Sequence, residues 1–102
     1  MIKYLGNAAD FKDIIANGVV LVDFYADWCG PCRMLGPVLD KLNENRKDVT
    51  ILKVNVDDFG SLAQQFSVFS IPTMKLFKNG KPVGTRVGYV GYEPLIRFID
   101  SN

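Results

Sequence analysis

The chain contains no histidine and only two cysteines, Cys29 and Cys32, among its 102 residues. Zinc sites usually take four ligands, most often cysteine and histidine, and cysteine-histidine catalysis needs a histidine beside the nucleophile. Both kinds of site are therefore excluded, and we expect no metal centre. The cysteine pair remains open to three interpretations: a dithiol that cycles with a disulfide, a structural disulfide, or thiols that only fill space.

The chain also lacks an excess of charge, because twelve basic residues oppose eleven acidic ones and leave a net charge of +1. No basic cluster is present that would bind phosphates, so we do not expect a nucleic-acid partner. The longest apolar stretch, residues 18–26, is broken by Asp23 and is too short to span a bilayer. The first six residues lack the apolar core of a signal peptide. We expect a cytoplasmic protein with no membrane contact.

The composition is 48% hydrophobic and 12% aromatic, which is typical of a packed core and not of a disordered chain. A chain of this length forms one domain, so we expect residues 1–102 to fold as a single unit. No repeat, linker or low-complexity segment divides the sequence.

The first half of the chain predicts two helices around a buried strand. Apolar residues in 8–17 recur with helical spacing, and Gly18 follows as a stop. Residues 19–25 form a valine-rich apolar run, which is typical of a central strand buried on both faces. Helical spacing returns over residues 31–45.

The second half predicts further strands and helices. Asn79-Gly80 is a strong hairpin signal, so the strands on either side of it should be antiparallel. The order of elements implies an α/β fold, with a parallel pair joined by a crossover in a mixed sheet and helices on both faces. In chain order we expect a strand over 50–56, a short helix over 61–66, strands over 73–77 and 82–87, and a last helix that begins near Pro94.

Both cysteines lie in the motif Trp28-Cys29-Gly30-Pro31-Cys32, where the buried strand leads into a helix. A separation of three residues is nearly one helical turn, so the two sulfurs share a face and can form a disulfide. Pro31 presets the backbone at the first turn, and Gly30 lets another chain approach closely. The motif therefore predicts a disulfide that opens and closes reversibly.

Their positions give the two cysteines different chemistry. Cys29 lies beside unpaired N–H groups and the positive end of the helix dipole, which favours its thiolate, so it is the expected nucleophile. Cys32 lies one turn deeper, where burial disfavours the charged form, so it is the expected resolving thiol. In thiol-disulfide exchange Cys29 attacks a partner's disulfide, and Cys32 then attacks the resulting mixed disulfide and releases the reduced partner.

The segment Val22-Asp23-Phe24-Tyr25-Ala26-Asp27-Trp28-Cys29-Gly30-Pro31-Cys32-Arg33 resembles the active-site segment of the thioredoxin family. A bare CxxC is weak evidence, but further similar segments follow in order over nearly the whole chain. The resemblance implies the thioredoxin fold and a protein-disulfide reductase that serves electron transport and cell redox homeostasis. The further segments are Lys53-Val54-Asn55-Val56-Asp57, Ile71-Pro72-Thr73, Phe77-Lys78-Asn79-Gly80 and Val87-Gly88.

The resemblance also assigns roles that spacing does not. Asp23 resembles the family's buried carboxylate, which assists proton transfer at the inner cysteine, and Lys53 resembles the charge partner of that carboxylate. Pro72 resembles a cis-proline that faces the cysteines, beside backbone that pairs with a bound peptide. The resemblance places Trp28, Ile71, Pro72 and Gly88 in the partner-binding surface and gives Gly30 and Pro31 an influence on the redox potential.

The partners that the resemblance implies are all proteins. A thioredoxin reductase, which uses NADPH through flavin, would recharge the dithiol. Neither cofactor is expected to bind to this chain, since it has no phosphate-cradling glycine motif. Expected substrates are disulfides in proteins such as ribonucleotide reductase, peroxiredoxin and methionine sulfoxide reductase, and we expect a monomer.

Three residues depart from the usual family pattern. Tyr25 stands where tryptophan is frequent, Ser70 precedes Ile-Pro, and Tyr89 stands where a small residue is common. These departures bear on partner preference and not on the chemistry of the cysteines.

Two other functions remain open at the level of sequence. One is an oxidant or isomerase, which uses an unstable disulfide to make bridges in other proteins. The other is a noncatalytic thioredoxin-like module that binds partners or acts as a chaperone. The Gly-Pro dipeptide and the lack of an export signal favour the reductase over the first, and the intact cysteines favour it over the second.

Overall fold

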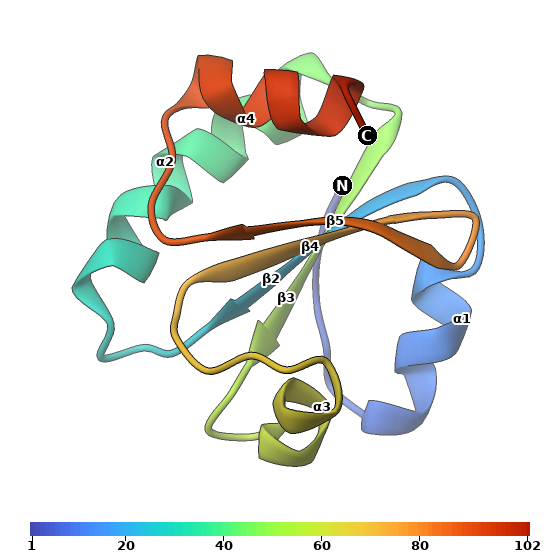
Figure 1. Cartoon of the computed structure of the whole chain (residues 1–102), viewed down its shortest axis with the longest axis vertical. Coiled ribbons are helices and arrows are strands. Elements are labelled where there is room, and N and C mark those ends of the chain that lie inside the picture. Colours follow the sequence, from blue (N-terminus) through green and yellow to red (C-terminus); the bar gives the residue numbers. More distant parts are fainter.

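A computed structural model describes all 102 residues as a five-stranded sheet with helices on both faces (Figure 1). The strand order is β1-β3-β2-β4-β5. Strand β3 pairs in parallel with both β1 and β2, β4 is antiparallel to β2, and β5 is antiparallel to β4. The predicted mixed sheet is therefore confirmed. The strands are β1 (Ile2–Tyr4), β2 (Val19–Tyr25), β3 (Val49–Asn55), β4 (Thr73–Lys78) and β5 (Lys81–Val87).

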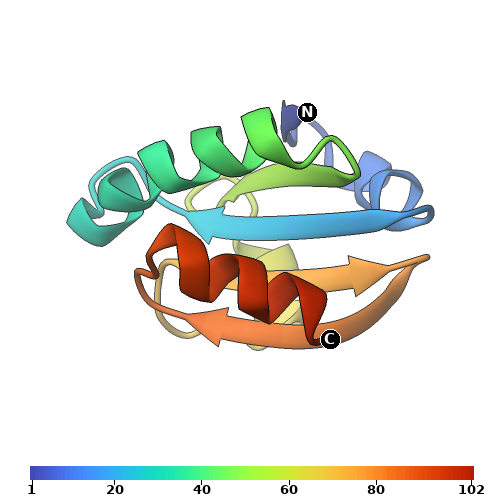
Figure 2. The same ribbon diagram turned by 90° about the horizontal axis from the view of Figure 1, so that it is seen from above.

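The helices form two layers. In Figure 2, α2 and α4 lie in front of the sheet and α3 lies behind it. Neither they nor α1 has both the length and the apolar character needed to cross a membrane. The helical segments are a short 3₁₀ turn (Ala8–Asp10), α1 (Phe11–Ile15), α2 (Gly30–Asn45), α3 (Gly60–Gln65) and α4 (Tyr92–Asp100).

Most predicted elements are confirmed to within one or two residues, but the N-terminal region differs. The helix expected over 8–17 is a 3₁₀ turn, in which the Asn7 side chain accepts a hydrogen bond from the Ala9 N–H, followed by the short α1. Strand β1 was not expected, because three mostly exposed residues carry no periodic signal. Backbone pairing with β3 defines this strand.

Side-chain alternation along β2 determines which layer each residue meets. Val20, Val22 and Phe24 belong to the core beneath α1 and α3, whereas Leu21 belongs to the core beneath α2 and α4. Asp23 alternates with its neighbours and therefore faces the same side of the sheet as Leu21, the side covered by α2. The polar residue of this buried strand thus points toward the motif that follows it.

Candidate active site

The two cysteines begin helix α2. Cys29 is the N-cap residue, and its Sγ accepts a hydrogen bond of 3.2 Å from the Cys32 backbone N–H. The two residues are joined by a disulfide, with their Cα atoms 5.2 Å apart, and each is only 4% exposed. When the bond is reduced, the same N–H and the helix dipole favour a thiolate on Cys29, the more N-terminal sulfur.

A second loop lies against the disulfide. The Ile71–Pro72 peptide bond is cis, and the carbonyl oxygen of Ile71 is 3.8 Å from Cys29 Sγ. The hydroxyl of Thr73 donates to the Ser70 carbonyl at 2.6 Å, and the Gly88 N–H donates to the Pro72 carbonyl at 2.8 Å. Three segments that are distant in sequence therefore meet at the cysteines.

Trp28 directly precedes Cys29 and exposes an apolar ring next to the cysteine motif. Its side chain is 68% exposed, yet its indole N–H donates a 3.0 Å hydrogen bond to the Asp57 carboxylate. Arg33 donates to the Asp27 carbonyl at 2.9 Å, which fixes the preceding turn. The indole is thus oriented by hydrogen bonding while its apolar surface stays open to a partner.

Asp23 is completely buried, and neither of its carboxylate oxygens has a hydrogen-bond partner. Burial raises the pKa of this carboxyl from 3.8 to about 6, although the positive charge of Lys53 opposes the rise. A group with this pKa exchanges its proton close to neutral pH. Such a group suits proton transfer to or from a neighbouring thiol.

Lys53 lies opposite Asp23 in the parallel β2–β3 register, but no ion pair within 4.0 Å joins the two. The Lys53 ammonium instead lies 4.6 Å from the ring centre of Tyr25 and 5.6 Å from that of Tyr4. Lysine therefore acts on the carboxylate through space, and its direct partners are two aromatic rings.

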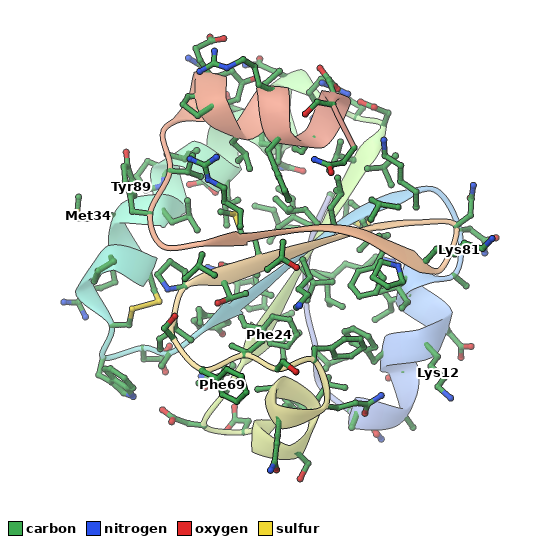
Figure 3. The ribbon with its side chains drawn as sticks, in the orientation of Figure 1. Lys12, Phe24, Met34, Phe69, Lys81 and Tyr89 are labelled. Carbon is green, nitrogen blue, oxygen red and sulfur yellow. A yellow bond between two sulfur atoms is a disulfide. The ribbon has the colours of Figure 1, made fainter.

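Sequence reasoning did not identify all the apolar side chains around the disulfide. Phe69 is 88% exposed and Met34 is 61% exposed, and both join the half-exposed Tyr89 at this end of the molecule. In Figure 3, Met34 and Tyr89 lie above the yellow S–S bond and Phe69 lies below it. The available signal was the isolated Phe69 in a loop two residues before Ile71-Pro72, where no helical or strand period explains an aromatic residue.

The other predicted residues lie close to the same junction. Gly30 and Pro31 form the first turn of α2 between the two cysteines, Pro72 is buried, and Gly88 has a positive φ of 88°. No group of three or more histidine, cysteine, aspartate or glutamate residues lies close enough together to hold a metal ion.

The family model for thioredoxin matches residues 3–101 of the chain. The chain belongs to the thioredoxin family. It is 48% identical to the thioredoxin of Chlamydia caviae over 102 aligned residues. The alignment covers 100% of this chain and 99% of that protein. It is also 50% identical over 93 residues to the thioredoxin of Chlamydia trachomatis, with 91% of each chain covered.

Solved thioredoxins have the same fold. A mutant thioredoxin of Halobacterium salinarum superimposes with a TM-score of 0.91 and 40% identity, covering 98% of this chain and 88% of that one. Oxidised mitochondrial thioredoxin 3 of Saccharomyces cerevisiae gives a TM-score of 0.90 and 35% identity, covering 99% and 95%. These superpositions confirm the fold that the sequence predicts.

Membership of the thioredoxin family gives the cysteine pair its function. Thioredoxins are thiol-disulfide oxidoreductases that reduce protein disulfides through a cysteine pair and carry no cofactor. Cys29 and Cys32 are this pair, so the prediction of a redox-active disulfide is confirmed. The family is recycled by thioredoxin reductase. A relative in Mycobacterium leprae is named a bifunctional thioredoxin reductase/thioredoxin. The two are 46% identical over an alignment that covers 89% of this chain and 20% of that protein.

Proposed function

We propose that this protein reduces disulfides in cytoplasmic proteins and is recharged by a separate NADPH-dependent thioredoxin reductase. The observation that carries the proposal is the placement of Cys29 at the start of α2, beside the Ile71–Pro72 loop. Exposed apolar side chains lie at the same end of the molecule (Figure 3), and we call them the apolar rim: Trp28, Met34, Phe69 and Tyr89. A partner's disulfide can approach this end of the molecule without disturbing the fold.

The first step is attack by the Cys29 thiolate on one sulfur of the partner's disulfide. A new bond forms between Cys29 Sγ and that sulfur, and the other sulfur of the partner leaves as a thiolate. The Cys32 N–H, which donates to Cys29 Sγ in the oxidised protein, supports the thiolate before attack. Cys29 is therefore the nucleophile of the proposed mechanism.

The second step is release of the partner by Cys32. Cys32 transfers its proton to the Asp23 carboxylate, and its thiolate attacks Cys29 Sγ, which restores the internal disulfide and frees the partner's second sulfur as a thiolate. The buried carboxylate is a competent base because its pKa is raised to about 6 by desolvation. Lys53 limits this rise through its positive charge.

The remaining predicted residues have positioning roles in this proposal. Trp28, Ile71, Pro72 and Gly88 contact the partner's polypeptide around its disulfide, and the backbone at Ile71 is available to pair with an extended segment. Gly30 and Pro31 shape the short turn between the cysteines and so influence the stability of the disulfide relative to the dithiol.

The proposed electron donor is a thioredoxin reductase that passes electrons from NADPH through flavin. The mycobacterial relative supports this pairing, because its name places reductase and thioredoxin in one protein. The proposed acceptors are disulfide-forming enzymes of the kinds expected from the resemblance: ribonucleotide reductase, peroxiredoxin and methionine sulfoxide reductase.

The test is NADPH oxidation in the presence of a thioredoxin reductase and insulin, with the wild type compared with Cys29→Ser and Cys32→Ser. We expect turnover by the wild type and none by either variant. Cys32→Ser should also accumulate a mixed disulfide with the substrate, whereas Cys29→Ser should not. If folded wild type shows no turnover with several reductases, the proposal fails and a noncatalytic binding module becomes the better explanation.

A further inference from the structure

A small cleft lies beside Cys32, at the N-terminal end of α2. Its volume is about 320 Å³, and its lining includes Tyr4, Tyr25, Lys53, Cys32, Asp27 and Arg33. It therefore connects the resolving cysteine with the lysine that acts on Asp23.

Strand register places four of the relevant side chains on one face of the sheet. Tyr4 on β1 is paired with Lys53 on β3, and Lys53 is in turn paired with Asp23 on β2. Tyr25 follows Asp23 by two residues, so it points to the same face. Three adjacent strands thus present a tyrosine, a lysine and a carboxylate side by side, with a second tyrosine at the end of β2.

Lys53 does not form an ion pair with Asp23, although the two side chains carry opposite charges. Asp23 lies next to it in register with two unpartnered oxygens, yet the ammonium lies over the rings of Tyr25 and Tyr4, 4.6 and 5.6 Å from their centres. Both distances are within the range of cation–π attraction. The ammonium therefore lies against the two rings that line the cleft, and Lys53 is only partly buried.

We propose that Tyr4 and Tyr25 form a two-ring cage that holds the Lys53 ammonium out of an ion pair with Asp23 and so keeps this carboxylate available to the Cys32 proton. The two tyrosines are positioning residues, since they act on the proton through Lys53. Tyr25 also packs against the cluster of Ala26, Cys29 and Cys32. The inference rests on the proposed role of Asp23 in the resolving step.

The physical consequence follows from the charges that face Asp23. The only charge that shifts the pKa of Asp23 is that of Lys53 on β3. The other titratable groups that line the cleft are Asp27, Cys32, Arg33 and the two tyrosines, while β4 pairs Asp23 with the uncharged Met74. An ammonium released from the cage would approach the unpartnered carboxylate and favour its ionised form. Asp23 would then be a weaker base for the Cys32 proton.

The primary experiment is an NMR titration of the Asp23 carboxyl carbon in the oxidised protein. Tyr4 is 67% exposed, so Tyr4→Leu removes a ring with little risk to folding. We expect Tyr4→Leu, and more strongly Tyr25→Leu, to lower the midpoint by roughly 0.5 to 1 pH unit, because an approaching positive charge stabilises the carboxylate. Tyr4→Phe and Tyr25→Phe keep the rings and should titrate like the wild type.

The same substitutions in a Lys53→Met variant show whether the shift of the Asp23 midpoint depends on the lysine. In Lys53→Met the cage has no cation to hold, so adding Tyr4→Leu should leave the Asp23 midpoint unchanged. In single-turnover measurements, the acid limb of the resolving-step pH profile should move by the same amount as the NMR midpoint.

Three results would contradict the proposal that the tyrosines hold the Lys53 ammonium. They are an unchanged or raised midpoint in both leucine variants, a shift that persists in Lys53→Met, or phenylalanine variants that behave like the leucine ones. The titration needs no turnover, so it remains decisive for the cage even if the reductase assay contradicts the proposed function.

Discussion

The two faces of the sheet carry different kinds of core. Beneath α1 and α3, four phenylalanines pack ring to ring, with centroid distances of 5.3 to 6.3 Å. Beneath α2, an equally buried layer contains the carboxyl of Asp23, which has no hydrogen-bond partner. Burial of the aromatic rings stabilises the fold, whereas burial of an ionisable group on the α2 face lowers the stability.

The largest expected effect comes from breaking the aromatic face. Phe77 is 1% exposed and contacts the rings of Phe11 and Phe66. Phe77→Ala should lower the free energy of unfolding by about 3 to 5 kcal/mol, through lost burial and the cavity left behind. Urea unfolding measures this loss. The folded variant should retain the wild-type redox potential, and a changed potential would contradict the separation of the two faces.

The next effect comes from the carboxyl on the opposite face. Below about pH 4, Asp23 is protonated in both the folded and the unfolded chain. Between about pH 4 and 6 the unfolded chain releases this proton while the folded chain retains it, so the free energy of unfolding falls as the pH rises. A pKa raised from 3.8 to about 6 corresponds to a loss of about 3 kcal/mol above pH 6.

Asp23→Asn tests this linkage because it removes the titration while keeping the size of the side chain. In urea unfolding of the oxidised protein from pH 4 to 8, the variant should lack the fall that the wild type shows. It should also slow the resolving step at neutral pH. Parallel stability profiles for the two proteins would show that Asp23 does not titrate as burial requires.

The smallest expected effect separates a buried phenylalanine from an exposed one. Phe69 belongs to neither core of the sheet and is 88% exposed, two residues before Ile71. Phe69→Ser should raise the KM for insulin roughly three- to tenfold, since partial burial of such a side chain is worth about 1 kcal/mol. Its unfolding free energy should stay within about 0.5 kcal/mol of the wild type.

The control for Phe69→Ser is the reduction of cystine, a small disulfide that lacks the polypeptide with which Phe69 would make contact. Reduction of cystine should proceed equally in the wild type and in Phe69→Ser. Equal losses with insulin and cystine would mean that the substitution perturbs the cysteines, and unchanged kinetics with both would exclude Phe69 from the partner-binding surface.

The amino-acid pattern predicted the parts of this protein that depend on near neighbours. The valine-rich run of β2, the Asn79-Gly80 hairpin and the start of α2 at the cysteine motif each have a local cause, and each was confirmed. Strand β1 escaped prediction because its three residues become a strand only by pairing with β3. Phe69 escaped prediction as a site residue because exposure is not a local property.

The sequence by itself therefore indicated the redox chemistry, since two thiols three residues apart at a helix start can form a disulfide, and the segments that resemble the thioredoxin family identify this disulfide as redox-active. Only the tertiary structure decided how that chemistry is tuned. The pKa of Asp23 depends on desolvation by burial, and the Lys53 ammonium lies 5.6 Å from the ring centre of Tyr4, which is 49 residues away along the chain and is paired with Lys53 only across β1 and β3. Burial and cross-strand contact are collective properties, so no short motif can encode them.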